Sequence, residues 1–458
     1  MAIDMTSALL TDLYQLNMMQ AYLDHGETDV AVFELFFRTL PSRRGFLMAA
    51  GLEQALDCLE DLRFAADDLD WLARSGRFSK PFLDYLAAFH FTGDVDAMPE
   101  GTVFFADEPV LRIVAPLPEA QYFETRLINI LHFQTVIAAK AARLVLVAPD
   151  RLMVDFGLRR AHGAEAGLWA ARASYLAGFA GTATTLAERL YGIPIYGTMA
   201  HSFVQAHDDE TTAFETFARS RPKNLTLLID TYDTEAAARK VVALAPRLAA
   251  RGIEITAVRI DSGDLAAQAK RVRRILDAGG LARTAIFASG GLDEDRIRAM
   301  LADGAPIAGF GVGTSLTTSS DVPALDCAYK LQEYAGIARR KRSAGKATWP
   351  GRKQVWRRFG ADGKMHGDVL SLVDDDVDGT PLLEPVMRNG RRLARPSLDQ
   401  IRANTAHNLA ALPEPLRRLE TGAVYPVQVA DALIRLTAVV DRRAGATPPP
   451  ERAAPIDR

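Results

Sequence analysis

The sequence predicts an α/β protein. An irregular α/β barrel fills the middle of the chain, and a flanking α+β domain is built from the N- and C-terminal segments. Three observations predict this fold. Short apolar runs alternate with amphipathic helical stretches between residues 151 and 323, each run ends in glycine or polar residues, and hairpin signals lie outside this region. The 458 residues are 48% hydrophobic, which is enough to build a large core.

Six apolar runs define the predicted strands of the barrel. They are rich in β-branched residues and almost continuously apolar, as are parallel strands that are covered on both faces. The runs span residues 152–157, 193–201, 225–230, 253–261, 284–291 and 305–314. Helical stretches such as 234–251 and 265–279 lie between them. Six strand–helix units in series favour a closed or nearly closed barrel over an open sheet of the Rossmann type.

The flanking segments predict one mixed α+β domain. The N-terminal flank predicts a helix over 9–23 and strands over 30–40 and 102–116. In the C-terminal flank, Asp362-Gly363 and Asn389-Gly390 are typical of hairpin turns. Strands are expected over 329–336, 353–359, 368–373 and 384–393, and helices over 398–413 and 427–440.

These patterns predict the following domain organisation. Residues 1–150 form the N-terminal part of the flanking domain, 151–323 form the catalytic barrel, and 324–443 complete the flanking domain. Residues 444–458 are rich in proline and predict a disordered tail.

Charge and cysteine content exclude several classes of protein. Lys and Arg number 54 and Asp and Glu 57, so the net charge is −3 and gives no general attraction to nucleic acid or an anionic membrane. The two cysteines, Cys58 and Cys327, form no CxxC pair and suit a reducing compartment. The start carries Asp4 and no basic segment, unlike a signal peptide, and no apolar run reaches the roughly 18 residues of a membrane span. We therefore expect a cytoplasmic protein without nucleic-acid or membrane partners.

Polar residues at the ends of the six runs predict the position of the active site. In α/β barrels the active site is built at the carboxyl ends of the strands, so these residues should converge on one rim. The alternative is that they are ordinary turn and helix-capping residues. That alternative is reasonable for any single run and weaker for six together.

Two consecutive glycine-rich strand ends predict a phosphate site. They are 289–294 (SGGLDE) and 311–315 (GVGTS). Glycine lets backbone N–H groups approach an anion, and late barrel strands often hold a phosphate in this way. Tight strand–helix turns are the alternative. The sequence contains no GxxxxGK[ST], HExxH or GxSxG motif, so a P-loop, a zincin and a nucleophile elbow are excluded.

The segment 259–265 (RIDSGDL) places Arg259 beside two carboxylates at a strand end. A carboxylate there can accept hydrogen bonds from ribose hydroxyls or hold a magnesium-bound phosphate. The alternative is that Asp261 or Ser262 caps the following helix, which leaves Arg259 unexplained.

His201 ends the predicted strand 193–201 and is a candidate nucleophile towards a phosphoryl group. The alternative is a hydrogen-bonded core histidine. His162 is a weaker candidate, and the spacing of His201 and His207 does not suit a shared metal ion.

The segment 155–160 (DFGLRR) offers an aromatic face and guanidinium groups for a flat, anionic ligand. Tyr14 and Arg38 are further candidates. Their alternatives are helix packing for Tyr14 and a solvated strand end for Arg38.

The motifs together resemble nicotinate phosphoribosyltransferase, a family of type II phosphoribosyltransferases. The resemblance runs from about Thr11 to about Arg358 and rests on segments in a fixed order. They are TDLYQL, FELFFRTLP, DFGLRR, YGIPIYGTMAHSF, RIDSGDL, ASGGLDE, FGVGTSL and GKATWPGRKQVWR. The resemblance implies an α/β-barrel homodimer with shared active sites, distinct from the Rossmann-like type I enzymes.

The resemblance also implies a reaction. Phosphoribosyl is transferred from 5-phosphoribosyl-1-diphosphate to nicotinate, giving nicotinate mononucleotide and diphosphate for NAD biosynthesis. ATP is a co-substrate whose hydrolysis to ADP and phosphate is coupled to the transfer. Mg²⁺ is expected to bind mainly through the substrate phosphates, and no tightly bound organic cofactor is expected.

The resemblance assigns the catalytic roles residue by residue. His201 matches a histidine that ATP phosphorylates transiently. Asp261 matches a ligand of the ribose hydroxyls, with Arg259 beside it. Phe156 matches one stacking face for the pyridine ring, and Tyr14 from a partner subunit matches the other. Arg159 is expected near the carboxylate or the ribose phosphate.

The remaining predicted site residues are ligands of phosphate and ribose. The substrate-binding group includes Thr198, Ser289, Gly290, Gly291, Gly313 and Thr314, with Arg38 reaching across a dimer interface. Lys346, Arg352 and Lys353 are candidates for diphosphate or ATP phosphates.

Substrate choice is predicted from the segment 179–184 (FAGTAT). The related nicotinamide enzyme has an aspartate where this chain has Ala183. Such a carboxylate would accept a hydrogen bond from an amide and repel a carboxylate, so its loss favours nicotinate. Two alternatives stay open: a nicotinamide or other pyridine phosphoribosyltransferase of the same fold, and a catalytically inactive homologue that binds metabolites.

Overall fold

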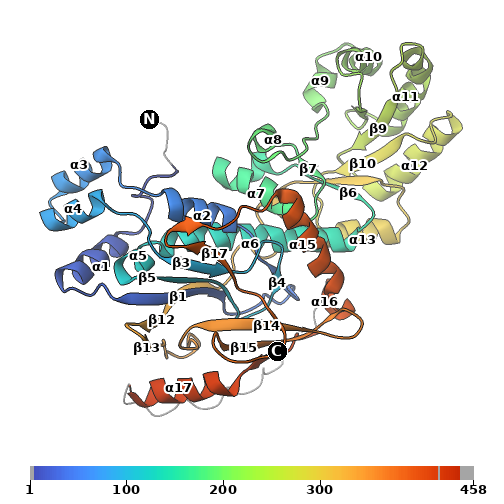
Figure 1. Cartoon of the computed structure of the whole chain (residues 1–458). Helices are drawn as coiled ribbons and strands as arrows, with labels where there is room; N and C mark the ends of the chain where they lie inside the picture. Colours follow the sequence, from blue (N-terminus) through green and yellow to red (C-terminus); the bar gives the residue numbers. More distant parts are fainter. Residues whose placement is uncertain (1–4, 421–422, 444–458) are drawn as a thin grey trace. The chain divides into compact units, whose positions relative to one another are not determined.

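The computed structural model describes residues 5–420 and 423–443, and these residues divide into two compact units (Figure 1). One unit comprises the described residues up to 135 together with 324–416 and those from 420 onward. The other comprises 136–323 and 417–419. The predicted disordered tail, 444–458, lies outside the described residues.

The second unit contains a parallel sheet in the order β7-β6-β11-β10-β9-β8. Its strands are β6 (Leu152–Asp155), β7 (Gly181–Thr182), β8 (Leu225–Leu228), β9 (Ile255–Ile260), β10 (Ala285–Ser289) and β11 (Gly309–Val312). Among the described strands β7 and β8 are edges that do not pair with each other, so the barrel is a curled half-barrel. The predicted irregular α/β barrel is confirmed in this form.

Helices follow the strands of this sheet along the chain, as a parallel sheet requires. They are α7 (Ala164–Leu176), α8 (Thr185–Tyr191), α9 (His201–Gln205), α10 (Glu210–Ser220), α11 (Thr234–Ala249), α12 (Leu265–Ala278), α13 (Glu294–Ala302) and α14 (Thr314–Thr317), with a short 3₁₀ turn η1 (Leu158–Arg160). Asp233, Asp264 and Asp293 cap α11, α12 and α13 by accepting backbone N–H groups of their first turns.

The predicted strand over 193–201 is wrong. Only Ile195 makes a ladder contact, an isolated parallel bridge to Thr182. Pro194 cannot donate a ladder hydrogen bond and Gly197 weakens extended pairing, so the segment runs as a loop beside β7 and reaches α9 at His201.

The first unit is built from mostly antiparallel sheets that combine both ends of the chain. The largest has the order β13-β12-β1-β5-β3-β17-β18. Its strands are β1 (Val30–Phe37), β3 (Asp94–Ala97), β5 (Pro109–Pro116), β12 (Cys327–Tyr334), β13 (Ile337–Ala338), β17 (Glu384–Arg388) and β18 (Arg391–Arg392). β1 pairs with β12 in a register that joins Leu35 to Tyr329, which confirms that the two flanks form a shared α+β domain.

Two smaller sheets complete this unit. β14 (Lys353–Phe359) and β15 (Met365–Leu372) form a hairpin at the predicted Asp362-Gly363 turn and pair with β16 (Thr380–Pro381) and β19 (Val427–Val429). β2 (Leu47–Met48) pairs with β4 (Val103–Phe104). The predicted Asn389-Gly390 turn joins β17 to β18.

The helices of this unit are α1 (Leu13–Asp24), α2 (Leu52–Asp61), α3 (Ala66–Ser75), α4 (Lys80–Ala87), α5 (Leu117–Tyr122), α15 (Leu398–Ala411), α16 (Glu414–Arg417) and α17 (Asp431–Arg443). Three of them, α1, α15 and α17, lie where the sequence predicts helices, and the others were not predicted. The helix expected over 427–440 begins only at Asp431, because the preceding Val427–Val429 forms β19 against β15.

Helix α6 (Glu124–Val147) was not anticipated from the sequence. Within the described residues it is the one helix long and apolar enough to cross a membrane, and 72% of its most apolar window is buried inside the protein. Such burial is typical of a core helix. Lys140 and Arg143 interrupt its apolar pattern.

Candidate functional site

The carboxyl ends of the parallel strands gather most of the predicted site residues. β6 leads into Phe156, Arg259 is the next-to-last residue of β9, Asp261 directly follows that strand, and Ser289 ends β10. Because the strands are parallel and neighbouring, these side chains meet at one edge of the sheet.

Arg259 connects the other residues of this edge. Its Nε donates to the Ser289 hydroxyl at 2.8 Å, its Nη1 to the Thr198 hydroxyl at 3.1 Å, and its Nη2 to Asp261 Oδ1 at 2.9 Å. The guanidinium carbon also lies 5.4 Å from the centre of the Phe156 ring. One planar cation therefore fixes three polar groups and one aromatic ring.

Asp261 is held as an ionised acceptor. Burial alone would raise the pKa of this carboxyl, but hydrogen bonds from Ser289 and Arg259 outweigh burial and lower it. Asp261 does not cap the following helix, because Asp264 accepts the N–H of Ala267 in that role. The alternative that Asp261 caps this helix is therefore wrong. Its Oδ2 lies 3.9 Å from His201 Nε2.

The ring of Phe156 is supported from behind. A Cβ added to Gly311 would lie 2.4 Å from Cδ2 of Phe156. Only glycine therefore lets β11 lie this close to the Phe156 ring. Phe287 packs against the ring with centroids 5.8 Å apart. Phe156 itself is half-buried, which leaves part of the ring open for stacking.

Asp155 secures the backbone beside that ring. Its carboxylate accepts from the Thr182 hydroxyl at 2.7 Å and from the N–H of Gly157 at 2.8 Å. Burial raises the pKa of Asp155 to about 6, although both hydrogen bonds oppose the shift. The sequence predicted Asp155 only as a polar strand end.

His201 is the first residue of α9 and does not end a strand. Its Nδ1 lies 3.1 Å from the Thr231 hydroxyl, and its side chain is 40% exposed. The alternative of a core histidine is therefore wrong, and Nε2 can be reached by a ligand. His207 instead contacts the Phe203 carbonyl at 2.8 Å. The described residues contain no group of three or more His, Cys, Asp or Glu side chains that could hold a metal ion.

The two glycine-rich loops lie next to these groups. Gly290 has φ +94°, and a Cβ there would lie 1.9 Å from the carbonyl oxygen of Asp261. Gly291 has φ +60°, and a Cβ on Gly313 would lie 3.2 Å from the carbonyl oxygen of Phe156. The Ser315 hydroxyl, next to Thr314, donates to the carbonyl of Leu292 and links the loops. Only glycine fits the first loop where it passes Asp261.

Arg159 and Ala183 lie at the same end of the sheet. Arg159 belongs to η1 and is exposed. Thr182 pairs with Asp155 across the β6–β7 ladder, so Ala183, which is exposed, follows at the level of Phe156. The predicted specificity position is thus adjacent to the predicted stacking ring.

Tyr14 and Arg38 belong to the other unit. Tyr14 lies on α1, is 45% exposed, and its hydroxyl is 3.4 Å from Glu124 Oε2. Arg38 follows β1 and its Nη1 donates to Asp326 Oδ1 at 2.5 Å. The Arg38 side chain is only 11% exposed, so the alternative that it is a solvated strand end is wrong.

The three predicted diphosphate ligands have different surroundings within that unit. Lys346 is exposed, and Arg352 donates to Glu333 through Nε and Nη2 at 3.1 and 2.9 Å. Lys353 is buried: its ammonium pairs with Glu34 Oε2 at 2.7 Å and donates to the carbonyls of Trp349 and Gly351. Because all three of its N–H donors are used inside the protein, Lys353 has none left for diphosphate.

Sequence reasoning missed Thr231 and the interactions of Asp230. Asp230 Oδ2 accepts from the backbone N–H of Asp261 at 3.0 Å and from the Ser262 hydroxyl at 2.7 Å. Its Oδ1 is buried and has no hydrogen-bond partner among the described residues. Both residues follow β8, and only the polar end of that run indicated them.

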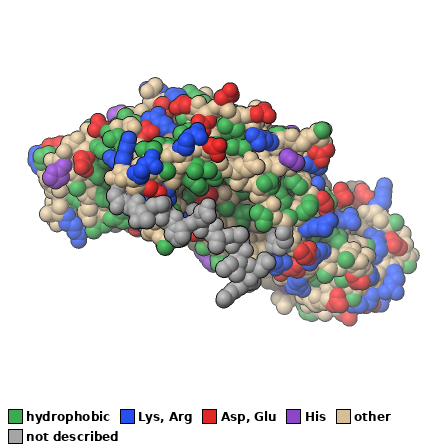
Figure 2. Space-filling model, turned by 90° about the horizontal axis from the view of Figure 1, so that it is seen from below, with side chains coloured by type: hydrophobic (Ala, Val, Ile, Leu, Met, Phe, Trp, Pro, Cys, Tyr) green, Lys and Arg blue, Asp and Glu red, His purple; other side chains and the backbone are tan. Residues whose placement is uncertain are grey.

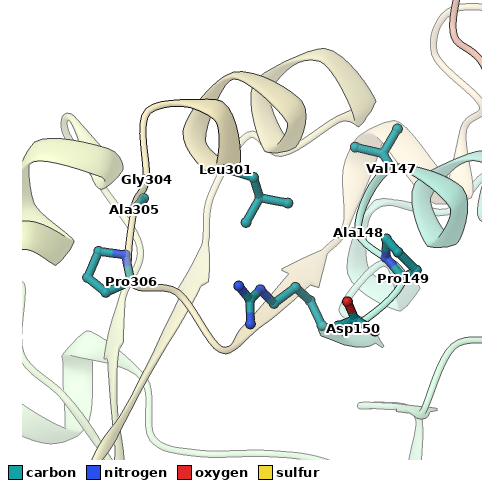
Figure 3. Close-up of a pocket in the computed structure, with 9 residues that line it drawn as sticks. Val147, Ala148, Pro149, Asp150, Leu301, Gly304, Ala305 and Pro306 are labelled. Atoms are coloured by element: carbon teal, nitrogen blue, oxygen red, sulfur yellow. The ribbon is translucent and has the colours of Figure 1, made fainter.

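A pocket of about 360 Å³ lies at the opposite ends of the strands (Figure 3). It is lined by 147–151, before β6, and by Leu301 and 304–306, before β11. Leu301 of α13 points between these two segments in Figure 3. Since the polar cluster stands at the carboxyl ends, this pocket is separate from the candidate active site.

Fold and site together define the class: an α/β enzyme whose active site is built at the carboxyl ends of parallel strands. Comparisons with known proteins then give the family. Residues 9–132 match the nicotinate phosphoribosyltransferase (NAPRTase) N-terminal domain, 152–342 the NAPRTase family, and 375–437 the NAPRTase C-terminal domain.

Curated relatives and a solved structure agree. A nicotinate phosphoribosyltransferase of Mycobacterium tuberculosis is 52% identical over 430 residues, covering 93% of this chain and 92% of that protein. One from Bacillus subtilis is 36% identical, covering 93% and 94%. The crystal structure of human nicotinic acid phosphoribosyltransferase has a TM-score of 0.84 and 29% identity, covering 94% of this chain and 99% of that chain. The chain belongs to the nicotinate phosphoribosyltransferase family.

Proposed function

We propose that this protein transfers phosphoribosyl from 5-phosphoribosyl-1-diphosphate to nicotinate, giving nicotinate mononucleotide and diphosphate for NAD salvage. The observation that carries the proposal is the cluster of Arg259, Asp261, Ser289 and Phe156 beside two glycine-rich loops. It combines an aromatic face, a ribose acceptor and backbone N–H groups in one place. Family membership supports the same reaction.

The residues divide the work of transfer between orientation and charge. Phe156 stacks the pyridine ring so that its nitrogen faces the ribose carbon. Asp261 accepts from the ribose hydroxyls, and an ionised carboxylate there also stabilises the positive charge that develops when diphosphate leaves. Backbone N–H groups of Gly290, Gly291 and Gly313, with the Thr314 hydroxyl, hold the 5′-phosphate.

Mg²⁺ fits this site as a partner of the substrate phosphates. The described residues offer no closed set of ligands, and the carboxylates at the rim are Asp230 and Asp261. The unpaired Oδ1 of Asp230 suits a water ligand of such an ion. When bound, Mg²⁺ would neutralise charge on the departing diphosphate.

ATP is proposed to act through His201. A ring nitrogen attacks the γ-phosphorus, the new P–N bond replaces the P–O bond to ADP, and water later releases phosphate. The contact of Nδ1 with Thr231 leaves Nε2, 3.9 Å from Asp261 Oδ2, as the more accessible nitrogen. The phosphohistidine adds negative charge beside Asp261 and so alters the affinity for substrate and product anions.

The active enzyme is proposed to be a cytoplasmic homodimer with shared sites. Tyr14 is exposed on α1 and could stack on the open face of a pyridine ring bound in a partner subunit. Arg38 would reach the phosphates in the same way. Basic and acidic side chains are interspersed over the face in Figure 2, which does not favour a nucleic-acid partner.

The test is product formation from nicotinate, 5-phosphoribosyl-1-diphosphate and Mg²⁺, with and without ATP, by the wild type and the variants His201→Ala and His207→Ala. Nicotinate mononucleotide should form in all three proteins. ATP should stimulate the wild type and His207→Ala but not His201→Ala. Phosphate from ATP should label the wild type and His207→Ala but not His201→Ala. No product from the wild type would overturn the proposed transfer, and equal ATP stimulation of all three would overturn the role of His201.

A further inference from the structure

Lys140 is a buried cation that the proposed reaction does not use. It lies in the apolar core helix α6, and its side chain is only 2% exposed. Its ammonium pairs with Glu294 Oε2 at 2.5 Å and with Asp321 Oδ1 at 2.8 Å. Burying a charge costs free energy unless its partners are well placed. The two ion pairs are therefore needed to keep the Lys140 ammonium inside the protein.

Each of the two carboxylates follows one of the glycine-rich loops along the chain. Glu294 is the first residue of α13, which follows Gly290 and Gly291. Asp321 follows α14, which begins after Gly313. One ammonium group therefore ties together the segments that carry the two halves of the proposed phosphate site.

A second cation of the same helix contacts this cluster. Arg143, one helical turn after Lys140 on α6, places its Nε 3.2 Å from Glu294 Oε1. Two cations thus face two carboxylates, and both cations come from one rigid helix. Without Lys140 the buried Glu294 and the partly exposed Asp321 would lose the cation that they share, and the loops would be expected to separate to admit water.

We infer that Lys140 is a positioning residue that sets the spacing of the two glycine-rich loops and so the affinity for the phosphoribosyl donor. This inference rests on the proposed function, in which these loops bind the 5′-phosphate. Lys140 contacts neither nicotinate nor the reacting atoms in that scheme. Its loss should weaken binding of the donor more than binding of nicotinate.

The test compares Lys140→Met with Lys240→Met. Lys240 forms a 2.7 Å ion pair with the buried Glu210 in the same unit, between α11 and α10, away from both loops. Lys140→Met should raise KM for 5-phosphoribosyl-1-diphosphate about 10-fold and KM for nicotinate less than about 2-fold. Lys240→Met should lower Tm but leave both KM values near those of the wild type. Equal changes in the two KM values in Lys140→Met would overturn the inference.

Asp321→Asn keeps the test informative if Lys140→Met does not fold. Asp321 is 17% exposed, so an amide there can be hydrated, and the pair of Lys140 with Glu294 is kept. The KM for the donor should rise about 3-fold with KM for nicotinate unchanged. An unchanged KM for the donor would overturn the inference.

Hydrogen exchange separates this inference from the proposed function. If the wild type forms no product, the reaction is wrong, and the spacing role is then judged by amide exchange in 289–292 and 311–315. Faster exchange there in Asp321→Asn than in Lys240→Met would support the role of Lys140. Equal exchange in both variants would overturn it.

Discussion

At the scale of single residues, Arg259 organises the candidate site. It reaches Ser289, Thr198 and Asp261 with three different nitrogens and lies over the ring of Phe156. A planar guanidinium can hold these directions at once, whereas a lysine ammonium concentrates its charge at one point. The geometry of the site therefore depends on the shape of this cation as well as its charge.

Arg259→Lys tests that dependence. We expect kcat/KM to fall about 100-fold, because the remaining contacts can no longer fix Asp261 and Ser289 together. Circular dichroism and Tm should show that the fold is kept. Arg283→Lys, at an exposed ion pair with Glu254, is the matched control and should keep full activity. Activity of Arg259→Lys close to that of the wild type would contradict the assignment.

Gly290→Ala tests the close approach of the first glycine loop to Asp261. The methyl group would meet the Asp261 carbonyl at 1.9 Å, so the loop must move, and kcat/KM should fall at least about 100-fold. Gly304→Ala is the control: its φ is +69°, but a Cβ there meets nothing within 4 Å. The control should lose only about 1–2 kcal/mol of unfolding free energy and keep its activity. Full activity in Gly290→Ala would mean that the loop does not hold the ligand.

Ala183→Asp tests the origin of substrate choice. A carboxylate at this exposed position beside Phe156 should repel nicotinate and raise its KM about 10-fold, which corresponds to about 1.4 kcal/mol. Ala183→Asn has nearly the same volume without the charge and should change KM much less. Steady-state kinetics of both variants decide the point, since an equal effect would indicate a steric cause.

At the scale of elements, the long apolar strands and the hairpins could be predicted from sequence, and the short elements could not. Asn389 and Gly390 have φ of +49° and +70°, the backbone that Asn-Gly turns favour. By contrast, β7 contains only Gly181 and Thr182, and its identity depends on pairing with β6. Helix α6 was missed because Lys140 and Arg143 conceal an apolar core helix.

The site was predictable where its residues end strands. Arg259, Asp261 and Ser289 could be placed together because parallel strands bring their carboxyl ends to one edge. The contact of His201 with Thr231 could not, since it joins a loop after β8 to the start of α9. Such contacts depend on three-dimensional neighbours that carry no pattern in the chain.

The β14–β15 hairpin contains a second buried charge cluster. Arg357 pairs with Asp368 at 3.0 and 2.6 Å across the hairpin, and the Tyr425 hydroxyl donates to Asp368 at 2.9 Å. Glu108 is buried nearby and accepts from the backbone N–H of Phe105 at 2.7 Å. Burial and the Asp368 carboxylate raise the pKa of Glu108 well above its usual range, against the effect of Arg357.

This raised pKa makes stability depend on pH. At pH values between the usual glutamate pKa and the raised pKa of folded Glu108, the folded protein holds a proton that the unfolded chain releases. The contribution of protonated Glu108 to the free energy of unfolding is therefore complete below the usual glutamate pKa. It is lost as the pH rises through the folded pKa. Glu108→Gln should therefore raise Tm more at pH 8 than at pH 5, as thermal unfolding at the two pH values would show. The exposed Glu254→Gln is the control and should change little at either pH. A larger gain at pH 5 would contradict the account.

At the scale of the whole molecule, the predicted site residues are divided between the two units. Phe156, Arg259 and His201 belong to the unit of residues 136–323, whereas Tyr14 and Arg38 belong to the other. The proposed homodimer explains this division if each site takes Tyr14 and Arg38 from its partner.

Mixing inactive variants tests shared sites. Arg259→Ala and Arg38→Ala homodimers should each be nearly inactive. After subunit exchange, half of the dimers should be mixed and carry one intact site of two, so activity should return to about one quarter of wild type. Size-exclusion chromatography with light scattering should show dimers throughout. No recovery in mixtures with proven exchange would contradict shared sites.

The central claim is that this chain is a phosphoribosyltransferase selective for nicotinate. The most direct measurement supplies the wild type with equal concentrations of nicotinate and nicotinamide, together with 5-phosphoribosyl-1-diphosphate, Mg²⁺ and ATP, and quantifies both mononucleotides by chromatography. We predict that nicotinate mononucleotide is the dominant product. Dominance of nicotinamide mononucleotide, or formation of neither, would contradict the claim.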